Sequence, residues 1–492
     1  MGKGEVRRFR EPQSKQRRAN MGKGEVRKHG TGKGMLALLV ALVFFCGLPL
    51  SAGAWSYKEA AKPYVGKSVT ILDEVTPLQE AMKKLVPDFI KETGIKVDYV
   101  ILNHFDVINK GQADLLSGTA AYDAVLLHSP QMGLIFNAGA IRPFDDLMSN
   151  PKLLSPALDP GDFIEPAWGS TAKFKGKTYG LLTWNYNQIY WTRADLMNNA
   201  AEKQAFKKKY GYDLAPAETM QQMRDIAEFF TRKKGEKLAG QTLESDFYGI
   251  VLEGLKSGTT FWDVIYNYIR NWGGNIFDAQ GKPSMDSPEN IAAVKFWASL
   301  WKFSPPGQSE YSLIDIPTLM GNGIAAQTIA WSDFVLGIDQ PAKSKLSGKF
   351  AYRGIPRNAN YTGPRSAEIE PSILAISKNS KNPEATYLFL QWMVEKSTQS
   401  KLFKTLGSGV PVRNSSWNDP TLAKSRFEPL YKAMQVSNKA GRGKPPAPKL
   451  YEMLDVMGGI LQEIGLGKKT AEDGMKEGQQ KVLQLCTDCV LK

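Results

Sequence analysis

The sequence contains few cysteine and histidine residues. Of its 492 residues, three are cysteine and three are histidine. Cys486 and Cys489 form a C-T-D-C pair near the C-terminus, which supplies at most half of a zinc site. The three histidines, His29, His104 and His128, are scattered along the chain. We therefore expect no metal centre, and we expect the two cysteines to form a small disulfide loop in an oxidising compartment.

Motifs of the common hydrolases and nucleotide-binding proteins are also missing. The sequence has no G-x-S-x-G, no H-E-x-x-H and no phosphate-binding loop. Many acidic residues are present, but no motif pairs two of them as a glycoside hydrolase requires. No basic stripe with interleaved aromatic residues indicates nucleic-acid binding. These absences favour a binding protein without a cofactor, and they leave a secreted carbohydrate-active enzyme as an alternative.

The longest apolar run is too short to span a membrane. It covers residues 35–50, about 16 residues against the ~20 that a spanning helix needs. The preceding segment, 1–34, contains eleven basic and three acidic residues, so its net charge of +8 leaves +6 of the formal +14 for the rest. Small residues at Ala52 and Ala54 follow the run. This pattern predicts a basic leader (1–34), a secretory signal (35–54) cleaved after Ala54, and a periplasmic protein.

The remaining chain is long and rich in aromatic residues. A chain of 492 residues is too long for a single core, so at least two domains are expected. It contains 11 tryptophans and 18 tyrosines. Such residues are common in protein cores, but their flat rings also suit the binding of carbohydrates.

Strand and helix patterns alternate after residue 55. The expected elements are strands over 66–75 and 95–102, helices over 77–94 and 104–118, and a strand within 119–130. A further strand is expected over 248–254. Alternating strands and helices predict a mostly parallel sheet. Ligands of such sheets bind at the carboxyl ends of the strands, where His128 falls.

Several motifs together resemble those of one family. Residues 367–395 contain a strand pattern, EIEPSILAI, then SKNSKNPEA, then a helix ending F-L-Q-W-M. This order resembles the family 1 extracellular solute-binding proteins, the receptors of ABC importers related to maltose-binding protein. Further resemblances follow in the family's order: YDAVL, GKTYGLLTWNYN, WGGNIFDAQGKP, GIAAQTIAWSDF and GSGVPVRNSS.

The resemblance implies an α/β fold of the periplasmic-binding-protein type, with two lobes joined by crossover hinge segments. Lobe one would comprise 55–183 with 371–412, and lobe two 186–368 with 414–485. It implies a monomeric receptor that captures a small solute, a sugar or polyol, and delivers it to the membrane permease of an ABC transporter. A receptor of the same fold for a charged ligand such as a polyamine remains an alternative.

Candidate ligand-binding residues are aromatic or polar side chains near the expected cleft. Trp331 ends an apolar run, and polar Asp333 follows two positions later, so Trp331 is the strongest candidate for stacking on a sugar ring. The others are Trp184, Asn185, Glu370, His128, Trp262 and Arg413. For Trp262, binding and core packing are equally supported, whereas Arg413 fits the hinge slightly better than the cleft.

Overall fold

The structure is a computed structural model and describes residues 55–256, 259–447 and 449–485. The predicted leader and signal (1–54) and the predicted disulfide between Cys486 and Cys489 lie outside these residues. The described residues belong to one compact unit.

A seven-stranded sheet organises this unit. Its strands run in the order β10-β6-β11-β3-β1-β2, and β9 also pairs with β6. Their bounds are β1 Ser68–Glu74, β2 Lys96–Leu102, β3 Ala124–His128, β6 Leu181–Arg193, β9 Gln327–Trp331, β10 Phe350–Arg353 and β11 Ile369–Ile376. Strand β1 is parallel to β2 and β3, but β11, β6, β9 and β10 join by antiparallel pairing. The expectation of a mostly parallel sheet is therefore correct only for β1–β3, because the crossover strands return in the opposite direction.

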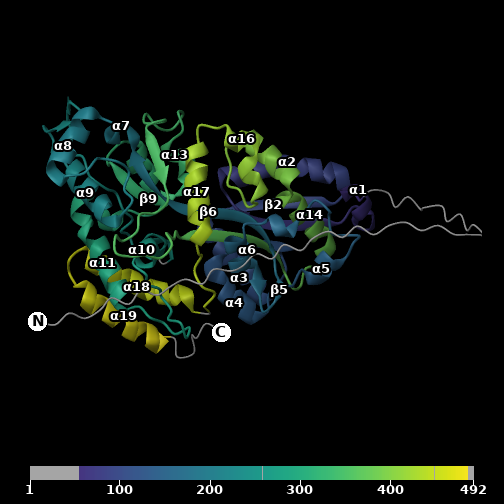
Figure 1. Cartoon of the computed structure of the whole chain (residues 1–492). Helices are drawn as coiled ribbons and strands as arrows, with labels where there is room; N and C mark the ends of the chain where they lie inside the picture. The colour runs from purple at the N-terminus through teal and green to yellow at the C-terminus, as the bar shows by residue number, and fades with distance from the viewer. Residues whose placement is uncertain (1–54, 257–258, 448, 486–492) are drawn as a thin grey trace, which may run out of the picture. The chain divides into compact units, whose positions relative to one another are not determined.

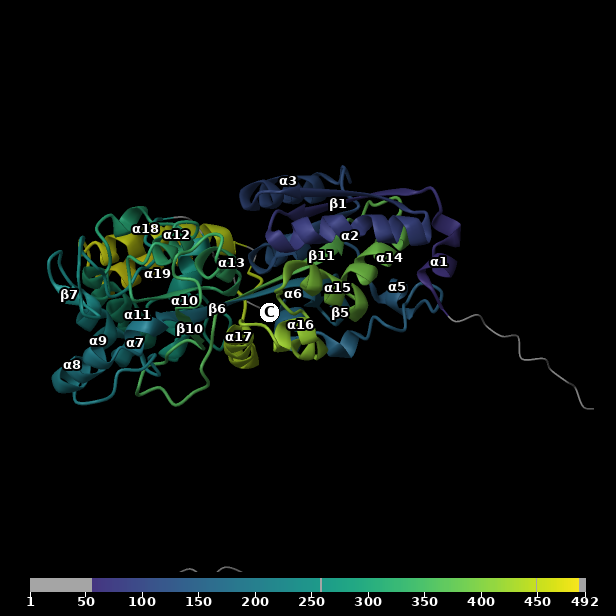
Figure 2. The ribbon, with the colours of Figure 1, turned by 90° about the horizontal axis from the view of Figure 1, so that it is seen from above.

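Strand β6 connects the two parts of the sheet. Its first half, from Leu181 to Asn187, pairs with β11, and its second half, from Gln188 to Thr192, pairs with β9. All 13 of its residues are buried. Figures 1 and 2 show β6 running between the helices that surround the two parts.

Helices cover both parts of the sheet. Around β1–β3 and β11 lie α2 (Pro77–Thr93), α3 (His104–Ser117), α4 (Met132–Ala138), α6 (Glu165–Ala172), α14 (Pro383–Val394) and α15 (Lys396–Leu406). Helix α2 begins at Thr76, whose hydroxyl accepts a hydrogen bond from Leu78 N, and ends at Gly94 with a left-handed φ of 71°. These contacts explain why its sequence pattern predicted its bounds closely.

A second group of helices has its own apolar core. It comprises α9 (Met220–Phe230), α10 (Thr259–Asn271), α11 (Pro288–Ser299), α18 (Leu450–Gly465) and α19 (Ala471–Leu485). Figure 1 shows α10, α11, α18 and α19 on one side of β6 and α2 and α14 on the other. Helix α17 (Glu428–Ala440) packs against β6 and β10.

One expected strand is absent. Residues 248–254 form only an isolated bridge, between Tyr248 and Ala325, rather than a strand. The apolar residues here are buried, and the backbone of Tyr248 and Val251 is hydrogen-bonded to residues 324–327 at the start of β9. An apolar run this short does not distinguish a regular strand from buried coil. Within the described ranges, no helix combines the length and apolar character needed to cross a membrane.

Candidate functional site

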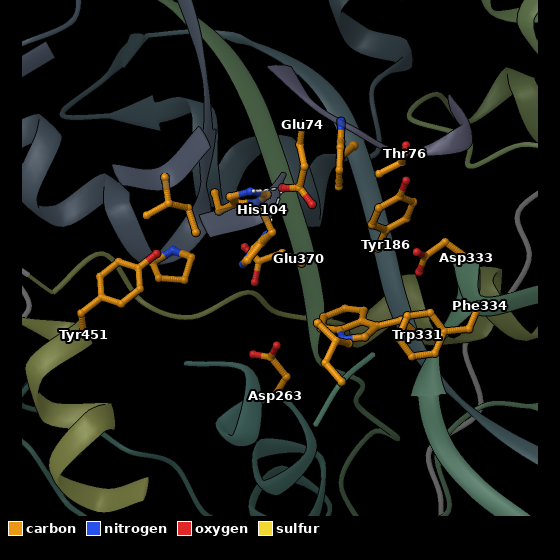
Figure 3. Close-up of a pocket in the computed structure, with 15 residues that line it drawn as sticks. Glu74, Thr76, His104, Tyr186, Asp263, Trp331, Asp333, Phe334, Glu370 and Tyr451 are labelled. Atoms are coloured by element: carbon orange, nitrogen blue, oxygen red, sulfur yellow. Dashed lines mark hydrogen bonds and ion pairs between the residues drawn. The ribbon is translucent and has the colours of Figure 1, made fainter. Parts of the chain in front are cut away.

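A pocket lies where several strand ends converge. It encloses about 620 Å³ of empty space, part of it open to solvent. The carboxyl ends of β1 and β3 contribute Glu74 and His128, as expected for parallel strands. The lining residues are Glu74, Thr76, His104, Ile108, His128, Pro130, Trp184, Tyr186, Asp263, Leu313, Trp331, Asp333, Phe334, Glu370 and Tyr451 (Figure 3).

Aromatic rings form one wall of the pocket. Trp184 and Tyr186 are alternate residues of β6, so both side chains emerge from the same face of the strand. Their ring centroids lie 4.7 Å apart in an edge-to-face arrangement. Trp331 ends β9, and its backbone pairs with Gln188 of β6. Phe334 follows in a short 3-10 helix, Ser332–Phe334. Trp184, Tyr186 and Trp331 are each less than 10% exposed, so these rings pack mainly against protein and border the pocket with a small part of their surface.

Glu74 joins two histidines on the opposite side. Its Oε2 lies 2.9 Å from Nε2 of His128 and 3.0 Å from Nδ1 of His104, the first residue of α3. Nδ1 of His128 lies 2.7 Å from the hydroxyl of Ser372. Burial acts to raise the pKa of Glu74, but the hydrogen bonds and charges of the two imidazoles outweigh it and lower that pKa to about 2. Burial likewise acts to lower the pKa of His128, whereas Glu74 raises it, with a net increase.

A buried lysine, Lys444, pairs with three carboxylates, two of which line the pocket. Lys444, only 2% exposed, has its ammonium 3.1 Å from Glu368 and 3.2 Å from Glu370, and it also contacts Asp263. Burial would lower the pKa of Lys444, but these carboxylates together raise it. Glu370 also accepts hydrogen bonds of 3.0 Å from the backbone and hydroxyl of Ser129. Its charge is therefore already compensated within the protein.

Lys444 belongs to a connecting segment, residues 441–447, that crosses the helix α4. A Cβ atom added to Gly133 of α4 would lie 2.6 Å from the carbonyl of Ala447, so the helix and the segment touch through backbone. A Cβ atom added to Gly443 would lie 3.1 Å from the hydroxyl of Ser129 and 3.2 Å from the ring of Pro371, so here the segment meets side chains. This contact joins residues that the sequence assigns to different lobes.

Two polar atoms of the pocket lack partners among the described residues. They are the indole Nε1 of Trp184, a donor, and Oδ1 of Asp333, an acceptor. Burial raises the pKa of Asp333 to about 7. Buried polar groups normally have hydrogen-bond partners, so both atoms are positioned to be satisfied by a bound molecule or water.

The structure brings together five of the eight predicted site residues. Trp331, Asp333, Trp184, Glu370 and His128 line the pocket.

The other three do not line it. The side-chain amide of Asn185 is aimed at the carbonyl of Pro411, 3.4 Å away. The indole of Trp262 donates to the carbonyl of Leu454, within the second core. The guanidinium of Arg413 donates to the backbone carbonyls of Val394, Leu158 and Asp159, which fits the reading of a structural residue.

The prediction from the sequence missed several residues that line the pocket. Glu74 ends the predicted strand 66–75, so the strand-end argument applied to His128 would have found it. His104 starts a predicted helix and carries no such signal. Asp263 and Tyr451 lie on α10 and α18, and only tertiary packing brings these helices to the pocket.

Comparison with curated proteins finds relatives that span most of the chain. A probable amino-acid ABC transporter periplasmic-binding protein of Sinorhizobium fredii is 24% identical over 438 residues, covering 86% of this chain and 90% of the relative. The erythritol/L-threitol-binding protein of Mycolicibacterium smegmatis is 22% identical, covering 74% and 73%.

Solved structures share the fold. An ABC transporter solute-binding protein of Agrobacterium radiobacter K84, in complex with ribitol, superposes with a TM-score of 0.70 at 22% identity, covering 86% of this chain and 99% of that one. One from Agrobacterium vitis S4 with bound D-mannitol gives 0.67 at 22% identity, covering 86% and 98%. The expected two-lobe α/β fold of periplasmic binding proteins is therefore confirmed. The sequence pattern of the bacterial extracellular solute-binding proteins matches residues 74–400, well over half of the chain. The chain is thus a member of the bacterial extracellular solute-binding protein family.

Proposed function

We propose that this protein is the receptor of an ABC importer, that it captures a small neutral polyol or sugar, and that it delivers this solute to the membrane permease. The observation that carries the proposal is the pairing of aromatic rings with two unsatisfied polar atoms, Trp184 Nε1 and Asp333 Oδ1. A hydroxyl group both donates and accepts hydrogen bonds, so one solute with several hydroxyls satisfies both atoms. Relatives and structural neighbours that bind erythritol, ribitol and mannitol support the same class.

The charge of the pocket argues against an amino acid as the solute, although the Sinorhizobium relative is named as a probable amino-acid-binding protein. An α-carboxylate calls for a cationic partner, and no lysine or arginine is among the described lining residues. The nearby Lys444 is engaged by three carboxylates. A neutral solute avoids burying an unpaired negative charge in this acidic pocket.

A cationic solute such as a polyamine is the second candidate. Four carboxylates, from Glu74, Asp263, Asp333 and Glu370, line the pocket. Three of them already have a cationic or histidine partner, which leaves Asp333 as the one without a partner among the described residues. The neutral class therefore fits better.

Isothermal titration calorimetry distinguishes these classes. Purified protein would be titrated with polyols of four to six carbons, with hexoses, with putrescine and spermidine, and with amino acids. We expect saturable binding of at least one polyol or sugar and no binding of amino acids. Saturation by a polyamine or an amino acid alone would contradict the proposal.

We also infer that the protein acts as a monomer outside the cytoplasmic membrane, as a receptor rather than an enzyme. The family's extracellular character supports this location, and the A-x-A sequence at Ala52 and Ala54 suits signal peptidase. N-terminal sequencing of exported protein should find Trp55 or a close neighbour. Retention of residues 35–50 in the exported protein would contradict the cleavage.

A further inference from the structure

Two histidines that are distant in sequence meet at one carboxylate. The chain has three histidines, and His104 and His128 are the two that follow the predicted signal. Both have a ring nitrogen within 3.0 Å of Oε2 of Glu74, as Figure 3 shows for Glu74 and His104. One ligand atom from each of the three residues lies within 4.8 Å of the others. This convergence uses every histidine of the described residues.

The surroundings fix the orientation of these groups. The hydroxyl of Ser372, 2.7 Å from Nδ1 of His128, sets which nitrogen of that ring faces Glu74. Outer partners of this kind orient the histidine ligands of metal sites. Glu74 and His128 are buried, whereas His104 is half-buried beside the pocket. The protein therefore surrounds Glu74 and His128, whereas His104 is partly accessible from the pocket.

The local charge favours a cation. Glu74 carries the negative charge that faces both imidazoles, and Glu370 contributes further negative charge at His128. The nearest cation beyond the imidazoles, Lys444, is occupied by its own carboxylates. A divalent ion at Glu74 would thus meet a carboxylate whose partners among the described residues are the two imidazoles rather than a lysine or an arginine.

We propose that Glu74, His104 and His128 bind a divalent transition-metal ion of the zinc type at the wall of the solute pocket. Two imidazole nitrogens and one carboxylate oxygen form a donor set that suits zinc, whereas magnesium and calcium prefer sites made of oxygen alone. Three protein ligands leave a coordination position directed at the pocket, where a solute hydroxyl or water can bind.

Metal binding requires only a small rearrangement. The present separations of 2.9 and 3.0 Å are hydrogen-bond distances. Ligand atoms of a tetrahedral site with metal bonds of about 2.0–2.1 Å lie roughly 3.3 Å apart, so each must move by a few tenths of an ångström. A metal ion binds histidine through an unprotonated ring nitrogen, so the nitrogens that face Glu74 must carry no proton when the ion is bound.

Metal titration of untagged protein, stripped with chelator, tests this site without any solute. Titration with ZnCl₂ should show one equivalent bound, and titration with MgCl₂ or CaCl₂ none. His104→Ala and Glu74→Gln should each weaken zinc binding at least tenfold, about 1.4 kcal/mol. Ser372→Ala should weaken it by about 10–100-fold, as expected for an outer partner.

Glu165→Gln is the matched control, because Glu165 is an exposed residue whose side chain is 63% accessible and pairs with Lys173. It should bind zinc as the wild type does. Because the mature chain would contain only two histidines, nitrogen-15 spectra of their rings should shift on zinc addition at constant pH.

Two results would overturn the metal site. One is zinc stoichiometry unchanged in the folded His104→Ala variant. The other is histidine signals that respond to pH but not to zinc, which would leave the cluster as a hydrogen-bond network. If Glu74→Gln fails to fold, the half-buried His104→Ala variant still decides the question. Solute binding is measured separately, so failure of this proposal leaves the receptor function intact.

Discussion

At the residue scale, we expect Trp331 to combine a binding role with a packing role. It is 6% exposed, so most of its indole is buried against protein. Trp331→Phe should weaken binding of the polyol or sugar at least threefold, about 0.7 kcal/mol, because the smaller ring offers less stacking surface. Titration calorimetry measures the change.

Trp262→Phe is the matched control for this change. Trp262 is 1% exposed and lies in the second core, away from the pocket. The Trp262→Phe variant should have a lower melting temperature than the wild type but the same affinity for the solute. Equal affinity losses in both variants would mean that Trp331 acts through stability alone.

Asp333→Asn should change how the stability of the unliganded protein depends on pH. The pKa of Asp333 is raised by burial to about 7, above ~3.9 for an unfolded aspartate. The folded protein thus binds more protons than the unfolded chain between these values, so this carboxyl's contribution to the free energy of unfolding falls as pH rises. The melting temperature of the variant relative to wild type should increase from about pH 4 to 7 and then stay level.

The control for this profile is Asp213→Asn, since the side chain of Asp213 is 82% exposed. Its melting temperature relative to wild type should show no such rise by fluorimetry. A flat profile for Asp333→Asn as well would mean that the carboxyl is not desolvated in the free protein.

At the scale of elements, the segment 441–447 depends on the charge of Lys444. Lys444→Met would leave the carboxylates of Asp263, Glu368 and Glu370 buried without their ammonium partner. Breaking a buried pair in this way costs about 3–5 kcal/mol, so we expect a large loss in the free energy of unfolding by urea titration. The loss should be greatest at high pH, where these carboxylates are ionised, and smaller in acid.

The comparison variant is Lys173→Met, in which an exposed pair with Glu165 is lost. Surface pairs contribute about 0–1 kcal/mol, so this variant should unfold almost as the wild type does. Similar losses in the two variants would show that the network around Lys444 does not stabilise the fold.

Local patterns predicted the first elements well. The strands expected at 66–75 and 95–102 are β1 and β2, and the helix expected at 77–94 is α2. Apolar periodicity, the proline at the first helical position and the terminal Gly94 are local signals, so they can be read from the sequence. The segment 248–254 lies beside the start of β9, but its hydrogen bonds to that strand stop at Val251 and leave a single bridge, an outcome that only tertiary structure decides.

The candidate site was predictable where it follows strand ends. His128 and Trp331 end β3 and β9, and their positions follow from the rule for ligand crevices. Asp263 and Tyr451 come from helices α10 and α18, and no spacing in the sequence links them to the strands. Arg413 was predicted as a site residue because it lies in a crossover motif. Its guanidinium instead donates hydrogen bonds to backbone carbonyls and does not reach the pocket.

At the scale of the whole molecule, we expect the protein to close on its solute. The predicted lobes are 55–183 with 371–412 and 186–368 with 414–485, and the crossover strands β6 and β11 contain their junctions. Closure by rotation about such crossovers is a known mode of periplasmic binding proteins. Small-angle scattering should show a smaller radius of gyration with the polyol that binds in calorimetry than without it. An identical envelope at saturation would contradict the hinge, and a non-binding polyol is the control.

Strand β6 also limits how the sequence can vary. Its 13 consecutive buried residues pair with β11 at one end and with β9 and β10 at the other. The pairing with β11 skips Thr183, and beyond this irregularity side chains alternate between faces. Deleting a single codon after Thr183 would therefore turn every side chain on one side of the deletion to the opposite face. Trp184 and Tyr186 would then leave the pocket, or the pairs with β9 would be lost. Natural and engineered changes of length should therefore accumulate in the connections, while this strand accepts substitutions only.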